Sequence, residues 1–242
     1  MTSADVSVIV PCYDTEHYLG EALESACEQS PPPLEIIVID DGSTDDSASI
    51  AERFGPPVRC YRQPHRGISA TRNAGLALAR GALIAFLDAD DVWTPGSLAC
   101  RLELLAGDAA AECAAGLVEQ FISPELPDDV RRTLACPPGV SRGRVTGALL
   151  MRRAAVVRVG DFDESIQVGE TVDWAMRAEA VGVVTRTVEQ VVLRRRIHGA
   201  NTGARNLHLR VDYLRVLKRS LDRKRAAKGS EADPSEPGRR DA

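Results

Sequence analysis

The chain has 242 residues, 44% of them hydrophobic, and a formal net charge of −5, so it can bury a sizeable core in one large or two small domains. Nucleic-acid-binding domains are usually basic, so this charge gives no support for that class. No lysine precedes Lys218, which excludes a P-loop NTPase, because its phosphate-binding loop requires a lysine.

The first hundred residues alternate between short β-branched runs and amphipathic segments. Strands are predicted at 6–10, 34–40, 58–61 and 82–88, and helices at 18–29, after Ser43 and at 69–81. Ser43 is expected to cap its helix, with Asp46 three residues on, and Gly81 to close the helix at 69–81. This alternation predicts an α/β fold with a mostly parallel sheet and right-handed crossovers.

The second half is less regular. It contains a predicted helix at 101–107, a strand at 114–121, a Pro-rich excursion at 122–139, a strand, helix and loop within 144–165, a helix at 169–182 and one or two strands within 183–198. An apolar stripe predicts a further helix at 206–226. The polar, Pro/Gly-rich remainder is expected to be disordered.

Three unusual clusters follow predicted strands: "PCYDT" (11–15), "DDGS" (40–43) and "DADD" (88–91). Ligands of such sheets bind outside the carboxyl ends of the strands, so the clusters should converge at one edge. Asp88 and Asp90 are two apart and can point to the same side. Such carboxylates suit Mg²⁺ or Mn²⁺ completed by water and phosphate; the alternative is a solvated acidic turn.

The ordered combination of a strand with Pro-x-Tyr, "VIDDGSTDDS", "GISATRNAGLALARG" and "LIAFLDADDVWTP" resembles the GT-A glycosyltransferases of family 2, closely over residues 5–100 and more loosely over 100–200. The resemblance implies a GT-A, Rossmann-like α/β/α sandwich with a mostly parallel central sheet. It implies one glycosyltransferase domain at 1–204, with a donor half at 1–100 and an acceptor half at 101–204. A C-terminal helix at 205–226 and a disordered tail at 227–242 would follow.

The resemblance also implies the residues that hold the nucleotide sugar. They are Pro11, Tyr13, Asp40, Asp41, Arg72, Asp88, Ala89, Asp90 and Arg196. Tyr13 offers the base a stacking surface, one of Asp40 and Asp41 accepts hydrogen bonds from base or ribose, and Arg72 meets base or diphosphate with a planar cationic fork. The family often has two glycines ahead of the "ISATRN" run, whereas this chain has Arg66 before Gly67.

A divalent cation, Mn²⁺ or Mg²⁺, is implied as the partner of the diphosphate. Its expected ligands are Asp90, Asp88, Asp91 and His198. By strand alternation Arg194, Arg196 and His198 share a side, with Arg194, Arg195 or Arg196 as phosphate partners. Trp93 is expected to pack beneath the site rather than to touch sugar.

"FDESIQVGETVDWAMRA" (162–178) resembles the acceptor side of the family, which commonly reads Gly-Glu-Asp-x-Asp-Trp, the Asp after Glu being the general base. Thr171 stands at that position, and a hydroxyl cannot serve as a base near neutral pH. Glu170 and Asp173, three apart on one helical face, are the expected replacements. Alternatively, the acceptor needs little base assistance, or the protein binds a nucleotide sugar without efficient transfer.

The expected function is metal-dependent, inverting transfer of a sugar from a nucleotide diphosphate sugar, namely a UDP sugar, to a glycan, small molecule or peptide. The alternative is a non-catalytic or very slow nucleotide-sugar binding protein. Without a signal peptide or a run of about 18 apolar residues, a cytoplasmic protein with no transmembrane segment is expected. The basic C-terminal helix has three readings: a solvated face, a peripheral membrane contact or a homodimer contact. Six cysteines without C-x-x-C spacing indicate reduced core thiols.

Overall fold

The computed structural model describes residues 4–142, 145–166, 168–199, 216 and 218–219. In the first half these form β1 (Ala4–Cys12), α1 (Leu19–Cys27), β2 (Pro33–Asp40), α2 (Ser47–Phe54), β3 (Val58–Arg62), α3 (Ile68–Leu78), β4 (Leu83–Phe86) and β5 (Val92–Trp93). In the second half they form α4 (Ser97–Gly107), β6 (Cys113–Ile122), α5 (Asp128–Arg131), β7 (Val140–Ser141), the 3-10 turn η1 (Thr146–Ala148), β8 (Leu149–Arg152), α6 (Arg153–Val159), α7 (Glu170–Ala180) and β9 (Thr185–Ile197).

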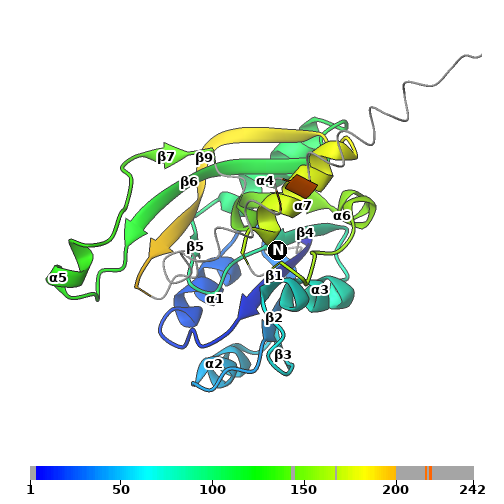
Figure 1. Cartoon of the computed structure of the whole chain (residues 1–242). Helices are drawn as coiled ribbons and strands as arrows, with labels where there is room; N and C mark the ends of the chain where they lie inside the picture. Colours follow the sequence, from blue (N-terminus) through cyan, green and yellow to red (C-terminus); the bar gives the residue numbers. More distant parts are fainter. Residues whose placement is uncertain (1–3, 143–144, 167, 200–215, 217, 220–242) are drawn as a thin grey trace, which may run out of the picture.

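One curved sheet runs through the described chain in the order β3-β2-β1-β4-β8-β6-β9-β5, with β7 attached to β6 (Figure 1). The α/β fold class is confirmed, and β1 to β4 are parallel as expected. Beyond β4 the sheet is mixed, because β8 is antiparallel to both β4 and β6, and β5 is antiparallel to β9. The chain passes from β6 to β8 through the one-turn helix α5, β7 and η1 rather than through a long crossover helix, and such a connection permits antiparallel pairing. The sheet is nevertheless mostly parallel, as expected, because β6 and β9 are parallel from Cys113 to Ile122 and the antiparallel pairings are short.

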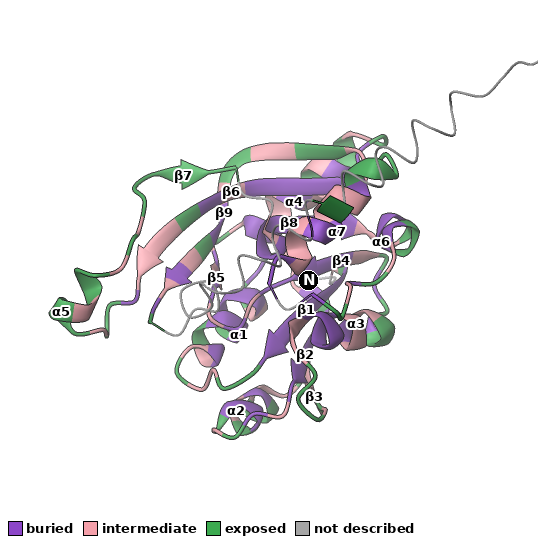
Figure 2. Cartoon of the chain, viewed as in Figure 1, coloured by how far each residue is buried: buried purple, intermediate pink, exposed green. Residues whose placement is uncertain are grey.

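The sheet is covered on both faces. Alternate residues of β1 point to opposite sides: Val8 and Val10 pack with α1, α2 and α4, whereas Ile9 packs with α3, α6 and α7. The strands β1 and β2 are accordingly buried in Figure 2. This is the predicted α/β/α sandwich, and its layers leave the carboxyl edge of β1, β2 and β4 to the loops.

Two helix boundaries differ from the predictions. Helix α2 begins at Ser47, and Ser43 does not cap it; the Ser43 Oγ accepts instead from the Asp14 amide at 3.0 Å. Helix α3 ends at Leu78, before Gly81. Gly81 passes so close to β1 that a Cβ would lie 2.6 Å from the Ser7 nitrogen, so glycine is required there for packing rather than for capping.

The predicted C-terminal helix and tail lie almost entirely outside the described residues. Of this segment Val216 is fully buried, and Arg219 Nη1 donates to Asp163 Oδ2 at 2.7 Å. Among the helices of the described ranges, none combines the length and apolar character needed to cross a bilayer. All six cysteines are free thiols, as expected, but only Cys12 and Cys113 are fully buried.

Candidate functional site

The first two predicted clusters meet at the carboxyl edge. The backbone amides of Asp14 and Thr15 donate to the hydroxyls of Ser43 and Ser47 at 3.0 and 2.9 Å, and the Thr44 amide donates to Asp14 Oδ1 at 2.8 Å. Such side-chain contacts to loop amides replace the missing ladder partners at strand ends. The convergence expected from strand order is therefore present for these two clusters.

The aromatic ring predicted to hold the base lies at the surface of this edge. Pro11 is buried inside β1, whereas Tyr13 just beyond it is 45% exposed. The Tyr13 ring lies 4.2 Å from the His65 ring, tilted by 31°. An exposed aromatic pair offers a planar surface on which a ligand ring can stack.

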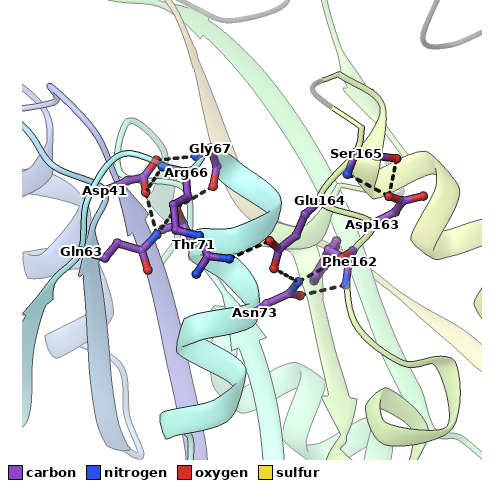
Figure 3. Close-up of polar contacts among 10 residues, drawn as sticks. All are labelled: Asp41, Gln63, Arg66, Gly67, Thr71, Asn73, Phe162, Asp163, Glu164 and Ser165. Carbon is purple, nitrogen blue, oxygen red and sulfur yellow. Dashed lines mark hydrogen bonds and ion pairs between the residues drawn. The ribbon is translucent and has the colours of Figure 1, made fainter.

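Asp40 and Asp41, predicted to accept from base or ribose, are both buried and both hydrogen-bonded within the protein. Asp40 accepts from the Ser43 amide and from Arg62 Nε. Asp41 accepts from Gln63 Nε2 at 2.6 Å and from the backbone amides of Arg66 and Gly67 at 3.0 and 2.8 Å. Asp41 thereby determines the shape of the loop at 63–67 (Figure 3), a role that the sequence did not indicate.

Gly42 makes a tight turn between these carboxylates and α2. Its φ is +78°, and a Cβ on Gly42 would lie 3.0 Å from the His65 nitrogen. Both the conformation and the space favour glycine. The turn brings the loop after β2 against the loop after β3.

Arg72 connects the donor-side and acceptor-side predictions. Its buried guanidinium donates from Nη2 to Asp88 Oδ1 at 2.9 Å and from Nη1 to Glu170 Oε1 at 2.5 Å. Burial alone would lower the pKa of Arg72, but the charges of Asp88 and Glu170 raise it above its usual value. Arg72 Nε has no hydrogen-bond partner within the described residues, which leaves one buried donor unsatisfied.

The three carboxylates of "DADD" take different partners, and Ala89 is buried between the first two. Asp88 binds Arg72, as above, and Asp90 Oδ2 lies 3.0 Å from His198 Nε2. Asp91 is buried, and its Oδ1 accepts from the Arg196 amide at 2.9 Å. Burial first, and then the charges of Asp90 and Asp88, raise the pKa of Asp91 well above its usual value.

Arg196 and His198 approach these carboxylates from the end of β9. The ring of His198 lies 4.6 Å from the Tyr18 ring. Arg196 is buried and donates from Nε to the Asp90 carbonyl at 3.0 Å, from Nη1 to Ser123 Oγ at 3.1 Å, and from Nη2 to Glu21. Arg196, in β9, therefore contacts α1 and the residue that follows β6. These bonds do not support the predicted contact of Arg196 with phosphate.

The two acceptor-side carboxylates of α7 do not face the same partners. Glu170 faces Arg72, and Thr171 Oγ1 donates to Glu170 Oε1 at 3.1 Å. Asp173 is buried, and Arg177 donates to its Oδ2 at 2.9 Å while contacting the Val159 carbonyl. The spacing of three placed both side chains near one helical face, but the structure directs only Glu170 toward Asp88.

The side chains at this edge fit a divalent cation that binds together with a diphosphate. No group of three or more His, Cys, Asp or Glu side chains converges on one point in the described ranges. One carboxylate and one imidazole, Asp90 and His198, do converge. Oxygen and nitrogen donors of this kind suit Mn²⁺ or Mg²⁺ when phosphate oxygens and water complete the shell.

Two cavities lie away from the Arg72–Asp88 contact. A cavity of about 270 Å³ lies between α3 and α6, and one of about 290 Å³ lies beside α1 and β5. Trp93 lines the second cavity but is almost fully buried, and its Nε1 donates to the Gly147 carbonyl at 2.9 Å. Trp93 is thus a packed residue of the core, with the Arg101 guanidinium over its ring.

The side chains that join the two halves are not predictable from the sequence pattern. Arg66 Nη2 donates to Glu164 Oε2 at 3.0 Å, and Asn73 Nδ2 donates to Glu164 Oε1 at 3.1 Å and to the Phe162 carbonyl at 3.0 Å (Figure 3). In the sequence, Arg66 stands out only because the family often has a glycine there. Glu164 is far from it in sequence, so no local pattern could have paired them.

Comparisons with known proteins agree with this geometry. The model of the family "Glycosyl transferase family 2" matches residues 7–128, half of the chain. The chain is 27% identical over 231 residues to "Chondroitin synthase" of Escherichia coli, covering 90% of this chain and 33% of that protein. It is 34% identical over 212 residues to "Succinoglycan biosynthesis protein ExoU" of Rhizobium meliloti, covering 75% and 60%.

A solved structure, "S. aureus TarS 1-349 in complex with UDP", matches with a TM-score of 0.67 at 19% identity, over 90% of this chain and 64% of that chain. An identity this low shows a shared fold. The chondroitin and hyaluronan synthases that it matches are far longer, and the chain spans about a quarter to a third of their length. The family match, the fold and the ordered loops at the carboxyl edge agree: the chain belongs to glycosyltransferase family 2.

Proposed function

We propose that the protein transfers a sugar from a UDP sugar to a hydroxyl acceptor, on a glycan, a small molecule or a peptide, with the help of Mn²⁺ or Mg²⁺. Residues 1–100 would hold the donor and 101–204 the acceptor. The supporting observation is the contact of Arg72 with both Asp88 and Glu170. This contact joins Asp88, proposed to lie on the diphosphate side, to helix α7, proposed to lie on the acceptor side, through one buried guanidinium.

The residues divide into a binding part and a reacting part. Tyr13 and the adjacent His65 ring offer the nucleobase a stacking surface. Asp90 and His198 would hold the cation, which when bound supplies Lewis-acid neutralisation of the leaving diphosphate. Glu170 is the carboxylate directed at this edge, so it is proposed to take the proton of the acceptor hydroxyl. Single displacement would invert the anomeric centre.

Asp173 is a weaker candidate for that proton transfer. Arg177 binds its carboxylate and also holds the carbonyls of Val159 and Asp161. This arrangement supports a structural role, in which Asp173 fixes α7 against the loop that follows α6. Asp173→Asn is therefore expected to lower stability, and Glu170→Gln to lower turnover.

Thermal unfolding with UDP and Mn²⁺, together and separately, tests the binding part. A ligand that binds only the folded state at about 100 times its Kd adds about 2.7 kcal/mol to stability, so a clear rise in Tm is expected only when both are present. Asp90→Ala should abolish the metal-dependent rise. Asp129→Ala, on exposed α5, is the matched control and should keep it. No rise with any nucleoside diphosphate would refute the proposal.

A second candidate is a nucleotide-sugar binding protein with very slow transfer. The observation that favours it is that both candidate bases of α7 are ion-paired, Glu170 to Arg72 and Asp173 to Arg177, while Thr171 replaces the expected base. Hydrolysis of UDP sugars in Mn²⁺ separates the two functions. Turnover that Glu170→Gln lowers supports the enzyme, whereas tight binding without turnover supports the second candidate.

A further inference from the structure

The loop at 63–67 is built around one carboxylate. Asp41 accepts from the side chain of Gln63 and from the amides of Arg66 and Gly67, and His65 Nδ1 lies 2.9 Å from Asp41 Oδ2. These contacts fix the backbone of the loop, while much of the His65 and Arg66 side chains remains exposed. The loop is a wall of the proposed nucleotide site, because the His65 ring lies against Tyr13.

A second segment, residues 162–166, lies alongside this loop and the start of α3. The Asn73 amide binds Phe162 in both directions, donating to its carbonyl at 3.0 Å and accepting from its nitrogen at 2.8 Å. Ser69 Oγ donates to the Ile166 carbonyl at 3.4 Å. Segment 162–166 precedes α7, whose first residue is Glu170, so its position influences that of the proposed base.

Arg66 and Glu164 connect the two segments directly. The Nη2–Oε2 distance is 3.0 Å, and the two side chains are 58% and 44% exposed. Figure 3 shows Arg66 extending from the loop beside Gly67 to Glu164, which also contacts Asn73. A glycine, which the family often has at position 66, could make no such contact. An exposed ion pair adds little to folding stability, so its effect should be on the relative position of the segments.

We propose that the Arg66–Glu164 ion pair is a latch that positions the 63–67 loop against segment 162–166 and so holds the proposed nucleotide-sugar site in its binding geometry. Arg66 and Glu164 are positioning residues here. The proposal rests on the proposed function for its effect on the donor, but the mechanical coupling of the two segments can be tested without any ligand.

Native-state hydrogen exchange tests the coupling. Arg66→Met removes the charge at similar length, and Glu164→Gln removes the charge while keeping an oxygen for Asn73. Each variant should speed exchange in both 63–67 and 162–166, and the double variant should match the single ones, because a shared contact can be lost only once. Faster exchange confined to the substituted segment, additive effects or no change would overturn the latch.

The Kd for UDP in Mn²⁺ tests the effect on the site. Each single variant should weaken binding by about two- to fivefold, the range expected for an exposed pair, with no further loss in the double variant and little change in Tm. The control pair is Arg142, just after β7, and Glu189 in β9, which is exposed and remote from the loop; Arg142→Met should leave the Kd unchanged. An unchanged Kd in the latch variants would overturn the positioning role. If the wild type binds no UDP, the proposed function fails, and hydrogen exchange still decides the coupling.

Discussion

Substituting Gly75 with alanine should destabilise the protein, because α3 approaches β1 too closely for a side chain. A Cβ built on Gly75 would lie 2.3 Å from Cγ2 of Ile9, which is fully buried. Ordinary carbon contacts are about 3.5–4.0 Å, so helix and strand must separate by more than about 1 Å. Overpacking of this kind costs about 1–3 kcal/mol, while alanine gains up to about 1 kcal/mol in helix propensity. A clash this deep places the net loss at about 2 kcal/mol.

Urea unfolding of Gly75→Ala measures this loss, and Gly20→Ala is the matched control. Gly20 lies in α1 with nothing within 4 Å of its added Cβ, so alanine there should stabilise the protein by about 0.5–1 kcal/mol. In an Ile9→Ala background the clash disappears, and Gly75→Ala should become neutral or stabilising. Equal effects of the two glycine substitutions in the wild-type background would refute the packing argument.

Three further substitutions or treatments test buried polar groups. Burial would raise the pKa of Glu35, but hydrogen bonds from Ser7 and Arg80 lower it overall. The stability that ionised Glu35 contributes is therefore present above its unfolded pKa and is lost as the pH falls through its folded pKa. In urea unfolding from about pH 7 to about pH 3, Glu35→Gln should therefore lose less stability on acidification than the wild type. Burial lowers the pKa of Arg101 to about 10. Arg101→Ala removes the hydrogen bond from Arg101 to the Leu149 carbonyl and should lower the free energy of unfolding by about 3–5 kcal/mol, measured by thermal unfolding. Arg101→Met should lower it clearly less. Burial raises the pKa of Cys113 to about 11, so this thiol should react slowly with a disulfide reagent at about pH 8 until urea unfolds the chain.

The sequence predicted the meeting of loops at the carboxyl edge well, because that meeting follows from the strand topology. Three clusters followed three buried strands, and parallel strands must bring their carboxyl ends to one edge. Placing Asp88 and Asp41 on that edge required no knowledge of side-chain partners. The same rule could not reveal that Asp41 accepts from the 63–67 loop, because its donors lie more than twenty residues away.

The less successful predictions concerned the contacts of long side chains, whose direction depends on tertiary partners. Alternation along β9 placed Arg194 and Arg196 on one side, and both guanidinium groups do lie over the Phe121 ring, at 4.4 and 4.7 Å. Alternation along a strand cannot predict that Arg196 Nη2 donates to Glu21, which is 175 residues away in the sequence. Likewise, helical spacing grouped Glu170 with Asp173, but tertiary partners separated them.

Thr171 contacts both Arg72 and the proposed base Glu170. Its hydroxyl donates to Glu170 Oε1 at 3.1 Å and accepts from Arg72 Nη1 at 3.3 Å, so the residue that replaces the expected base helps to orient the carboxylate beside it. An aspartate there would add a third carboxylate beside Arg72 and compete for the guanidinium.

If Glu170 is the working base, Thr171→Asp should leave UDP-sugar hydrolysis within about tenfold of the wild type, whereas Glu170→Gln should lose about 10²–10⁴-fold, the usual contribution of a general base. Thr171→Ser, which keeps the hydroxyl, is the control and should behave as the wild type. Hydrolysis that appears only in Thr171→Asp would mean that the base was lost rather than moved by one position, and it would leave the wild-type chain as a nucleotide-sugar binder.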